Sequence, residues 1–168
     1  MATSEVAKHR LFQFVDDPVT TLIDGSLIGI CLANADAMAV LSSRVHVVWT
    51  LAQGGTLEDR PRYNNSRCFD PFPFPALTDP QRLRLRTLGE ELDAHRKAQQ
   101  AANPRLTVTQ MYNVLEKLRA GETIEGNDKI IYDQGLIGIL KDIHDRIDTA
   151  VADAYGWLVD LSDEDILT

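Results

Sequence analysis

Proline is distributed unevenly along this chain, and this feature constrains the fold more than any other. Five of the seven prolines lie within residues 18–75. Proline fixes its own φ and biases the preceding residue toward extended backbone, so it disfavours helix interiors. From Thr78 onward, by contrast, apolar residues recur at helical spacings. The sequence therefore predicts an α+β protein, with a small mixed α/β part over residues 1–76 and an all-helical part over residues 77–168.

Two short runs in the first part are rich in aliphatic and aromatic residues, Arg10–Val15 and Ser26–Leu32. Turn signals at Asp16-Asp17-Pro18 and Asp24-Gly25 lie between them. This pattern is typical of short antiparallel strands.

A helix and an extended segment are predicted next. Apolar spacings of three and four indicate a helix from Asn34, which can cap it, to about Ala52, with Gly54-Gly55 as its stop. The segment Thr56–Pro75 has no helical period, and three of its prolines lie within Phe69–Pro75. We expect this segment to be a stiff extended strap.

The second part carries start and stop signals for three helices. The last of them contains Gly135 and Gly138, each costing about 1 kcal/mol relative to alanine, so a kink or a close helix contact is expected there. The predicted helices run from Thr78 or Asp79, with Pro80 in the first turn, to Asn103-Pro104; from the capping box Thr107–Gln110 to Gly121; and from Asp128 to Tyr155.

Both ends of the sequence suggest a piece of a longer polypeptide. Met1 opens almost directly onto a strand, and the helix start signal Ser162–Asp165 is followed by only three residues. A helix that short barely exceeds its own nucleus.

The composition excludes several classes of protein. The longest apolar run, Leu27–Ala33, is too short to span a bilayer, and no signal-peptide pattern is present, so we expect a cytoplasmic protein with no membrane partner. The two cysteines fit neither a disulfide framework nor a zinc knuckle. Cys31 lies in an apolar strand and is expected in the core, and Cys68 is expected to pack as an inert side chain.

Net charge separates the two parts. The total of -8 argues against a nucleic-acid binder, but residues 1–76 carry only -2 of it. Eight acids and one base lie within Asp142–Asp165, which indicates a solvated outer face or, alternatively, a surface that repels nucleic acid or docks a basic partner.

Catalytic patterns are absent from the sequence. It has no nucleophile elbow and no glycine-rich loop after a strand. His144 and Asp148 share a helix face, but two ligands do not make a metal site, and we expect them on a solvated, salt-bridged surface.

The segment Arg60–Arg67 stands out because it combines three arginines, a tyrosine and two asparagines. Arginine can bind guanine or phosphate with two hydrogen bonds, and asparagine can bind adenine in the same way. The alternative is a polar surface loop paired with Glu58 and Asp59. The candidate DNA contacts are Arg60, Arg62, Tyr63, Asn64, Asn65 and Arg67.

Several longer strings resemble one family. Ala39–Trp49 and Tyr63–Pro75 are similar to the end of the target recognition domain of MmeI-like DNA methyltransferases, large single-chain type II restriction–modification enzymes of bacteria. Strings later in the chain resemble the helical C-terminal domain of the same family: Leu88–Arg96, Leu106–Leu118, Tyr132–Leu136 and Ala154–Trp157.

The resemblance implies that catalysis and DNA recognition belong to different domains of one enzyme. The family's catalytic domain binds S-adenosylmethionine and methylates adenine at its exocyclic nitrogen through an Asn-Pro-Pro-Tyr type motif, which this sequence lacks. The chain is then a partial target recognition domain (1–76) plus a C-terminal helical domain (77–168), with no catalytic residue and no cofactor of its own. Its partners would be double-stranded DNA and the N-terminal methyltransferase domain of the same polypeptide. The alternative from another class is a helical protein-interaction scaffold that does not contact nucleic acid.

Overall fold

The computed structural model describes residues 1–15, 25–57 and 60–168, and it confirms the α+β class. The strands form two antiparallel pairs, β1 with β2 and β3 with β4. The elements in chain order are β1 (Ala2–Ser4), β2 (Leu27–Gly29), α1 (Ala35–Ser42), α2 (Arg44–Gln53), β3 (Gly55–Leu57), β4 (Arg60–Arg62), η1 (Asn65–Phe69, one turn of π-helix), α3 (Asp79–Ala102), α4 (Val108–Arg119), α5 (Gly126–Gly135), α6 (Ile137–Tyr155) and α7 (Asp163–Ile166).

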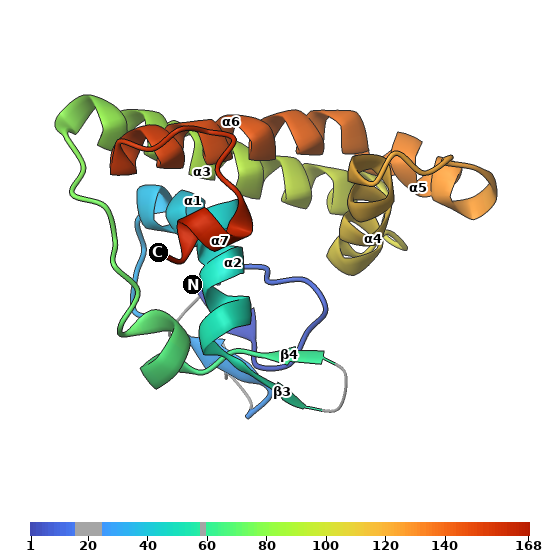
Figure 1. The fold of residues 1–168 in the computed structure, drawn as a ribbon. Helices are drawn as coiled ribbons and strands as arrows, with labels where there is room; N and C mark the ends of the chain where they lie inside the picture. The colour runs from blue at the N-terminus through green and yellow to red at the C-terminus, as the bar shows by residue number, and fades with distance from the viewer. Residues whose placement is uncertain (16–24, 58–59) are drawn as a thin grey trace.

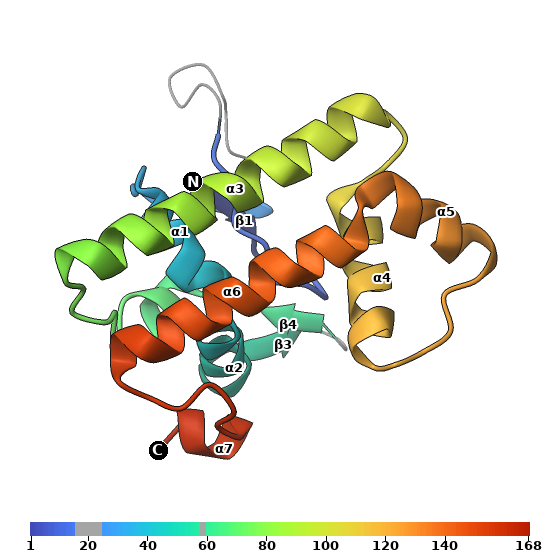
Figure 2. The ribbon, with the colours of Figure 1, turned by 90° about the horizontal axis from the view of Figure 1, so that it is seen from above.

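The two longest helices, α3 and α6, lie side by side and form a layer along one edge of the molecule (Figures 1 and 2). Helix α1 packs beneath this layer, mainly against α3, and α2 leads away from it to the β3–β4 hairpin. Helices α4 and α5 lie at one end of the layer (Figure 2). The hairpin therefore projects from the end of the molecule opposite the long helices (Figure 1).

One hydrophobic core runs through both parts of the chain. It includes α1 side chains such as Met38 and Leu41 together with Leu85 and Leu92 of α3 and Ile147 of α6, all at 0% exposure. Because α1 precedes residue 76 and the two long helices follow it, burial of the apolar face of α1 depends on the helical part.

Two helices that the sequence predicts as continuous are interrupted. The predicted 34–52 helix breaks at Ser43, whose hydroxyl donates to the Val40 carbonyl and accepts from the His46 amide at 3.4 Å, so one serine ends α1 and begins α2. The predicted 128–155 helix breaks at Leu136, which adopts φ of 45° between α5 and α6. The kink expected beside Gly135 is therefore confirmed.

The other helix boundaries agree well with the sequence. Thr78 caps α3, with Pro80 in its first turn, and the predicted capping box of Thr107 with Gln110 begins α4. Ser162 likewise forms a capping box with Asp165 at the start of α7.

The extended strap predicted over Thr56–Pro75 is wrong for most of its length. The chain instead folds back as the β3–β4 hairpin and then forms η1, and it is extended only after Pro71. Gly54 permits this return because a Cβ there would lie 2.8 Å from the Arg62 carbonyl oxygen.

The predicted strand at Arg10–Val15 is also wrong, since it contributes only an isolated bridge between Gln13 and Ala2. The predicted strand at Ser26–Leu32 is shortened to β2. The turn expected at residues 16–18 lies outside the described residues, as does Asp24 of the second turn.

Three side chains differ in burial from their prediction. Cys31 is exposed, not in the core, whereas Cys68 is buried as expected. His144 is buried, and its Nε2 lies 2.6 Å from the Tyr112 hydroxyl. Asp148 is half-buried and accepts a hydrogen bond from the Arg44 amide at 2.7 Å. The solvated face predicted for His144 and Asp148 is therefore wrong, because this face of α6 is covered by α2 and α4.

The contact of α1 with α3 depends on Gly89. A Cβ at this position would lie 2.1 Å from the Ala35 carbonyl oxygen, a backbone atom. We expect Gly89→Ala to destabilise the protein by about 1–3 kcal/mol in urea unfolding, although alanine favours helices. Gly138→Ala is the matched control, because its nearest atom is the Tyr132 hydroxyl at 3.0 Å, the end of a side chain. Equal stability of the Gly89 variant and the native protein would contradict this packing.

Candidate nucleic-acid interface

The segment Arg60–Arg67 is held by the β3–β4 hairpin and by η1. Gly55 pairs with Arg62 and Leu57 with Arg60 in an antiparallel register. The outer edge of β4 joins the N-terminal segment, since the Tyr63 amide donates to the Glu5 carbonyl at 2.7 Å and Val6 bridges Arg62. Strand β4 is therefore held on both of its edges by backbone hydrogen bonds, from β3 on one side and from the N-terminal segment on the other.

Arg60 and Arg62 are two positions apart on β4, so their side chains leave the same face of the strand. Both are exposed. The Arg62 guanidinium is paired with Glu5, whose Oε1 lies 2.7 Å from Nε and 2.6 Å from Nη2. Glu58 and Asp59, the acids considered as surface partners for this segment, lie outside the described residues.

Tyr63 lies in the core, whereas the sequence predicts it as a residue that contacts DNA. Its side chain is 1% exposed, and its hydroxyl lies 3.1 Å from Nε2 of the buried His46. The Arg10 guanidinium lies over its ring, 4.8 Å from the centroid. Burial raises the pKa of the Tyr63 hydroxyl above its usual value. Tyr63 thus supports the segment from beneath and does not reach the surface where a base could stack on it.

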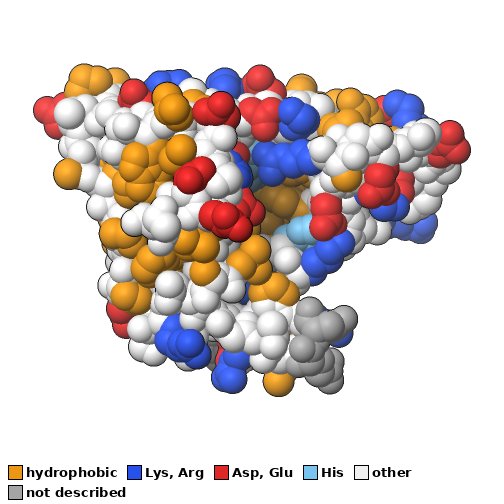
Figure 3. Space-filling view, in the orientation of Figure 1, with side chains coloured by type: hydrophobic (Ala, Val, Ile, Leu, Met, Phe, Trp, Pro, Cys, Tyr) orange, Lys and Arg blue, Asp and Glu red, His pale blue; other side chains and the backbone are white. Residues whose placement is uncertain are grey.

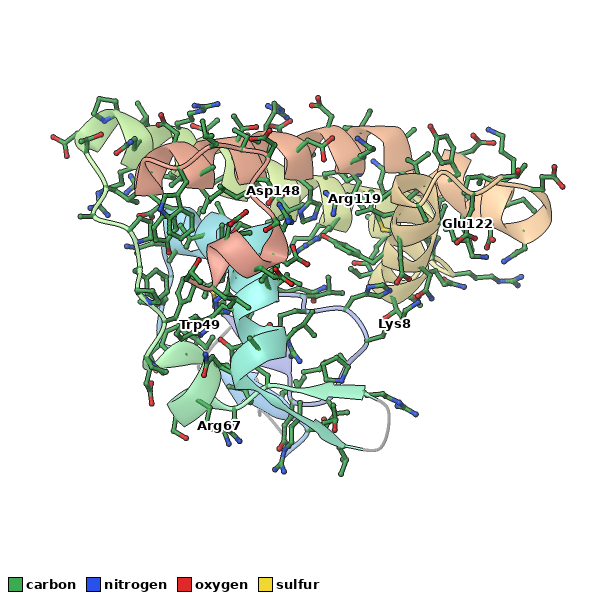
Figure 4. The ribbon with its side chains drawn as sticks, viewed as in Figure 1. Lys8, Trp49, Arg67, Arg119, Glu122 and Asp148 are labelled. Carbon is green, nitrogen blue, oxygen red and sulfur yellow. The ribbon has the colours of Figure 1, made fainter. Side chains whose placement is uncertain are left out.

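The remaining candidates lie around η1. Asn64 is half-buried and caps this turn, because its Oδ1 accepts from the Ser66 amide at 3.0 Å and from the Ser66 hydroxyl at 2.7 Å. Asn65 and Arg67 are exposed. Arg67 points away from the body of the molecule (Figure 4), and in the described part of the chain no carboxylate pairs with it. The structure thus brings Arg60, Arg62, Asn65 and Arg67 to the surface and uses Asn64 as a cap.

Arg10 belongs to this region although the sequence gives no sign of it. Its guanidinium donates to the Ser4 carbonyl and lies 3.5 Å from the Pro61 carbonyl oxygen. Burial lowers its pKa. It thereby joins the N-terminal segment to β4 from a position remote in sequence, where no spacing rule could find it.

Charged side chains of both signs lie on the face seen in Figure 3. Lys and Arg side chains are visible at the hairpin end, and Lys and Arg are mixed with Asp and Glu over the helices. The exposed carboxylates of α6 are partly compensated by bases, as in the pairs of Lys141 with Asp145 and of Arg146 with Asp142. At the hairpin end the exposed guanidiniums of Arg60, Arg62 and Arg67 provide positive charge that attracts a polyanion.

Within the described ranges, no group of three or more His, Cys, Asp and Glu side chains could hold a metal ion. None of the helices that the structure describes combines the length and the apolarity needed to cross a membrane.

Comparison with known proteins supports the first part of the resemblance. No curated protein and no solved structure matches the chain. The family model described as "MmeI, target recognition domain" matches residues 3–76, which contain most of β1, the elements from β2 to η1 and the whole Arg60–Arg67 segment. The predicted similarity to the MmeI target recognition domain is thus confirmed for residues 3–76, the part of the chain that carries the exposed arginines of the Arg60–Arg67 segment.

Proposed function

We propose that this chain is the DNA-recognition and helical part of a site-specific DNA adenine-N6 methyltransferase of a restriction–modification system. The observation that carries the proposal is the match of residues 3–76 to a target recognition domain whose exposed end presents arginines. In this proposal residues 1–76 read the DNA sequence, and residues 77–168 form the helical domain that supports them.

The hairpin has a suitable form for this role. The major groove of B-DNA is about 12 Å wide and admits a two-stranded β-ribbon. Arg60 and Arg62 leave one face of β4, and Arg67 lies on the adjoining turn. Asn65 adds an exposed amide. We assign base and phosphate contacts to these four residues, and we assign Tyr63 and Asn64 to support of the segment.

Methyl transfer itself is assigned to the methyltransferase domain expected in the same polypeptide of a bacterial cytoplasmic enzyme. That domain would supply the S-adenosylmethionine site and the Asn-Pro-Pro-Tyr motif that this sequence lacks. It would also supply much of the phosphate affinity, since phosphate contacts position a protein on DNA while base contacts specify the sequence.

A helical interaction scaffold remains the second candidate. Three apolar side chains of the α5–α6 region are exposed, Ile130, Leu136 and Ile139, at 54%, 43% and 49%. Exposed apolar side chains on helices are a feature of protein-binding surfaces when they are contiguous. DNA recognition is the better supported candidate because the family model covers the arginine-bearing end.

Binding of double-stranded DNA tests the proposal. We expect the chain to bind a pool of random duplexes in fluorescence anisotropy at low salt, and we expect Arg60→Ala/Arg67→Ala to weaken that binding. Each lost phosphate contact should make the negative slope of log K against log salt shallower by about 1. The control is Arg84→Ala/Arg86→Ala on the exposed face of α3, which removes the same charge elsewhere. Equal weakening by the two pairs would indicate that the hairpin is not the contact surface, and no binding by any form would refute the proposal.

A further inference from the structure

Glu5 and Arg62 form an ion pair whose geometry is more specific than that of an ordinary surface pair. A single carboxylate oxygen, Oε1 of Glu5, accepts a hydrogen bond from Nε of Arg62 at 2.7 Å and lies 2.6 Å from Nη2 of the same guanidinium. This contact occupies the Nε/Nη2 edge of the guanidinium. The other edge, formed by Nη1 and the second hydrogen of Nη2, keeps two parallel N–H donors for another acceptor.

Backbone pairing fixes both residues on a rigid element. The Glu5 carbonyl accepts from the Tyr63 amide at 2.7 Å, and the Ala7 amide donates to the Pro61 carbonyl at 3.3 Å. Arg62 is also in register with Gly55 of β3. Backbone hydrogen bonds of the N-terminal segment with β4 therefore hold Glu5 within reach of Arg62.

Stability alone gives little reason for this pair. The side chains are 49% and 28% exposed, and exposed ion pairs contribute only about 0.2–1 kcal/mol. The pair also compensates the charge of Arg62, which reduces the attraction of this arginine to phosphate. What it supplies is orientation, since a guanidinium held along one edge keeps a fixed direction for the other edge.

We propose that Glu5 is a positioning residue that orients Arg62 to read a guanine in the major groove. The free edge of Arg62 carries two parallel donors, and guanine is the base that presents two acceptors there, O6 and N7. Arg67, which has no such carboxylate at its side among the described residues, is assigned to phosphate. The inference rests on the proposed function and adds to it the residue that directs one base contact.

Selection from a random duplex pool tests this inference with the whole chain. We expect the native protein to enrich guanine at one position, with a preference of about 5- to 150-fold, the range that corresponds to one bidentate contact. Arg62→Ala should abolish the preference at that position. Glu5→Ala should reduce it to a few-fold while total affinity for DNA falls less than about threefold. Glu5→Gln still offers Arg62 one side-chain oxygen, that of the amide, as an acceptor, and should keep part of the preference that Glu5→Ala loses.

Two controls separate orientation from folding and from general affinity. Arg67→Ala should weaken binding to all sequences and leave the guanine preference intact. Circular dichroism should give each variant the native helix content. If Arg62→Ala loses the preference and Glu5→Ala retains it in full, the role of Glu5 is refuted while DNA recognition stands. If Arg62→Ala also retains every preference of the native protein, Arg62 reads no base. If the native protein enriches no sequence, the proposed function itself fails.

Discussion

Replacing Arg96 with alanine is expected to destabilise the protein by about 3–5 kcal/mol, a large part of the 5–15 kcal/mol that holds a typical domain folded. Arg96 is 2% exposed and is among the largest fully buried side chains. Its Nη1 donates to the Phe12 carbonyl at 2.9 Å, and its Nε donates to the Tyr112 hydroxyl at 2.9 Å. Truncation would leave a cavity and would remove the donors from two buried oxygens.

Urea unfolding followed by circular dichroism would measure this loss. The control is Arg84→Ala on the exposed face of the same helix, for which a change within about 0.5 kcal/mol is expected. The destabilisation by Tyr112→Phe should lie between these two values, at about 1–3 kcal/mol. This variant creates no large cavity, but it removes the hydroxyl that accepts from Arg96. An Arg96 variant as stable as the Arg84 variant would contradict a structural role for this network.

Acidification from pH 7 to pH 5 is expected to destabilise the protein by about 2 kcal/mol for each histidine that stays neutral when folded. Burial and the nearby Arg10 lower the pKa of His46 to about 3. Burial, with Arg96, Arg119 and His95 nearby, also lowers the pKa of His144 well below its usual value. Below about pH 6.5 the unfolded chain therefore binds protons that the folded protein does not, and stability falls with pH.

Urea unfolding of the native protein and of His46→Phe, at pH 7 and at pH 5, isolates the contribution of this histidine to the pH dependence of stability. This variant should lose about 2 kcal/mol of the pH dependence, since phenylalanine does not titrate. Tyr63→Phe removes the hydrogen bond of His46 but keeps the buried ring, so it should retain the dependence. Burial raises the pKa of Asp148, a contribution of opposite sign, which is why the window stops at pH 5. Identical pH dependence in His46→Phe and the native protein would disprove the assignment.

Local signals in the sequence predict the helix starts well. The capping box of Thr107 with Gln110 is a contact between residues three apart, so the local sequence is enough to indicate it. The break at Ser43 is harder to predict because Ser42-Ser43 lies within an apolar stripe that continues at helical spacing, so the capping hydrogen bonds of Ser43 with Val40 and His46 are not signalled by the pattern. The hairpin is missed because its outer edge pairs with Glu5 and Val6, far away in the chain.

The candidate site was predictable in position but not in the roles of its members. A cluster of arginines and asparagines indicated the exposed end of the first part, and Arg60, Asn65 and Arg67 do lie at the surface. Composition could not distinguish Tyr63, whose aromatic ring is equally suited to a base and to the core. Tyr63 is buried because its side chain packs with His46 and Arg10, which lie many residues away in the sequence. The contact of Glu5 with Arg62 is not predictable from the sequence for the same reason.

The shared core of α1 and the long helices has a consequence for exchanging recognition segments between related enzymes. A graft cut after residue 76 would carry α1 without the leucines of α3 that cover it, and Arg96 would lose the Phe12 carbonyl. Such a chimera would present apolar surface to water at the junction. A transplant of residues 1–76 that keeps its native shape should therefore include α3 and α6. Under the proposed function, the helical part then belongs to the smallest unit in which DNA recognition could be exchanged.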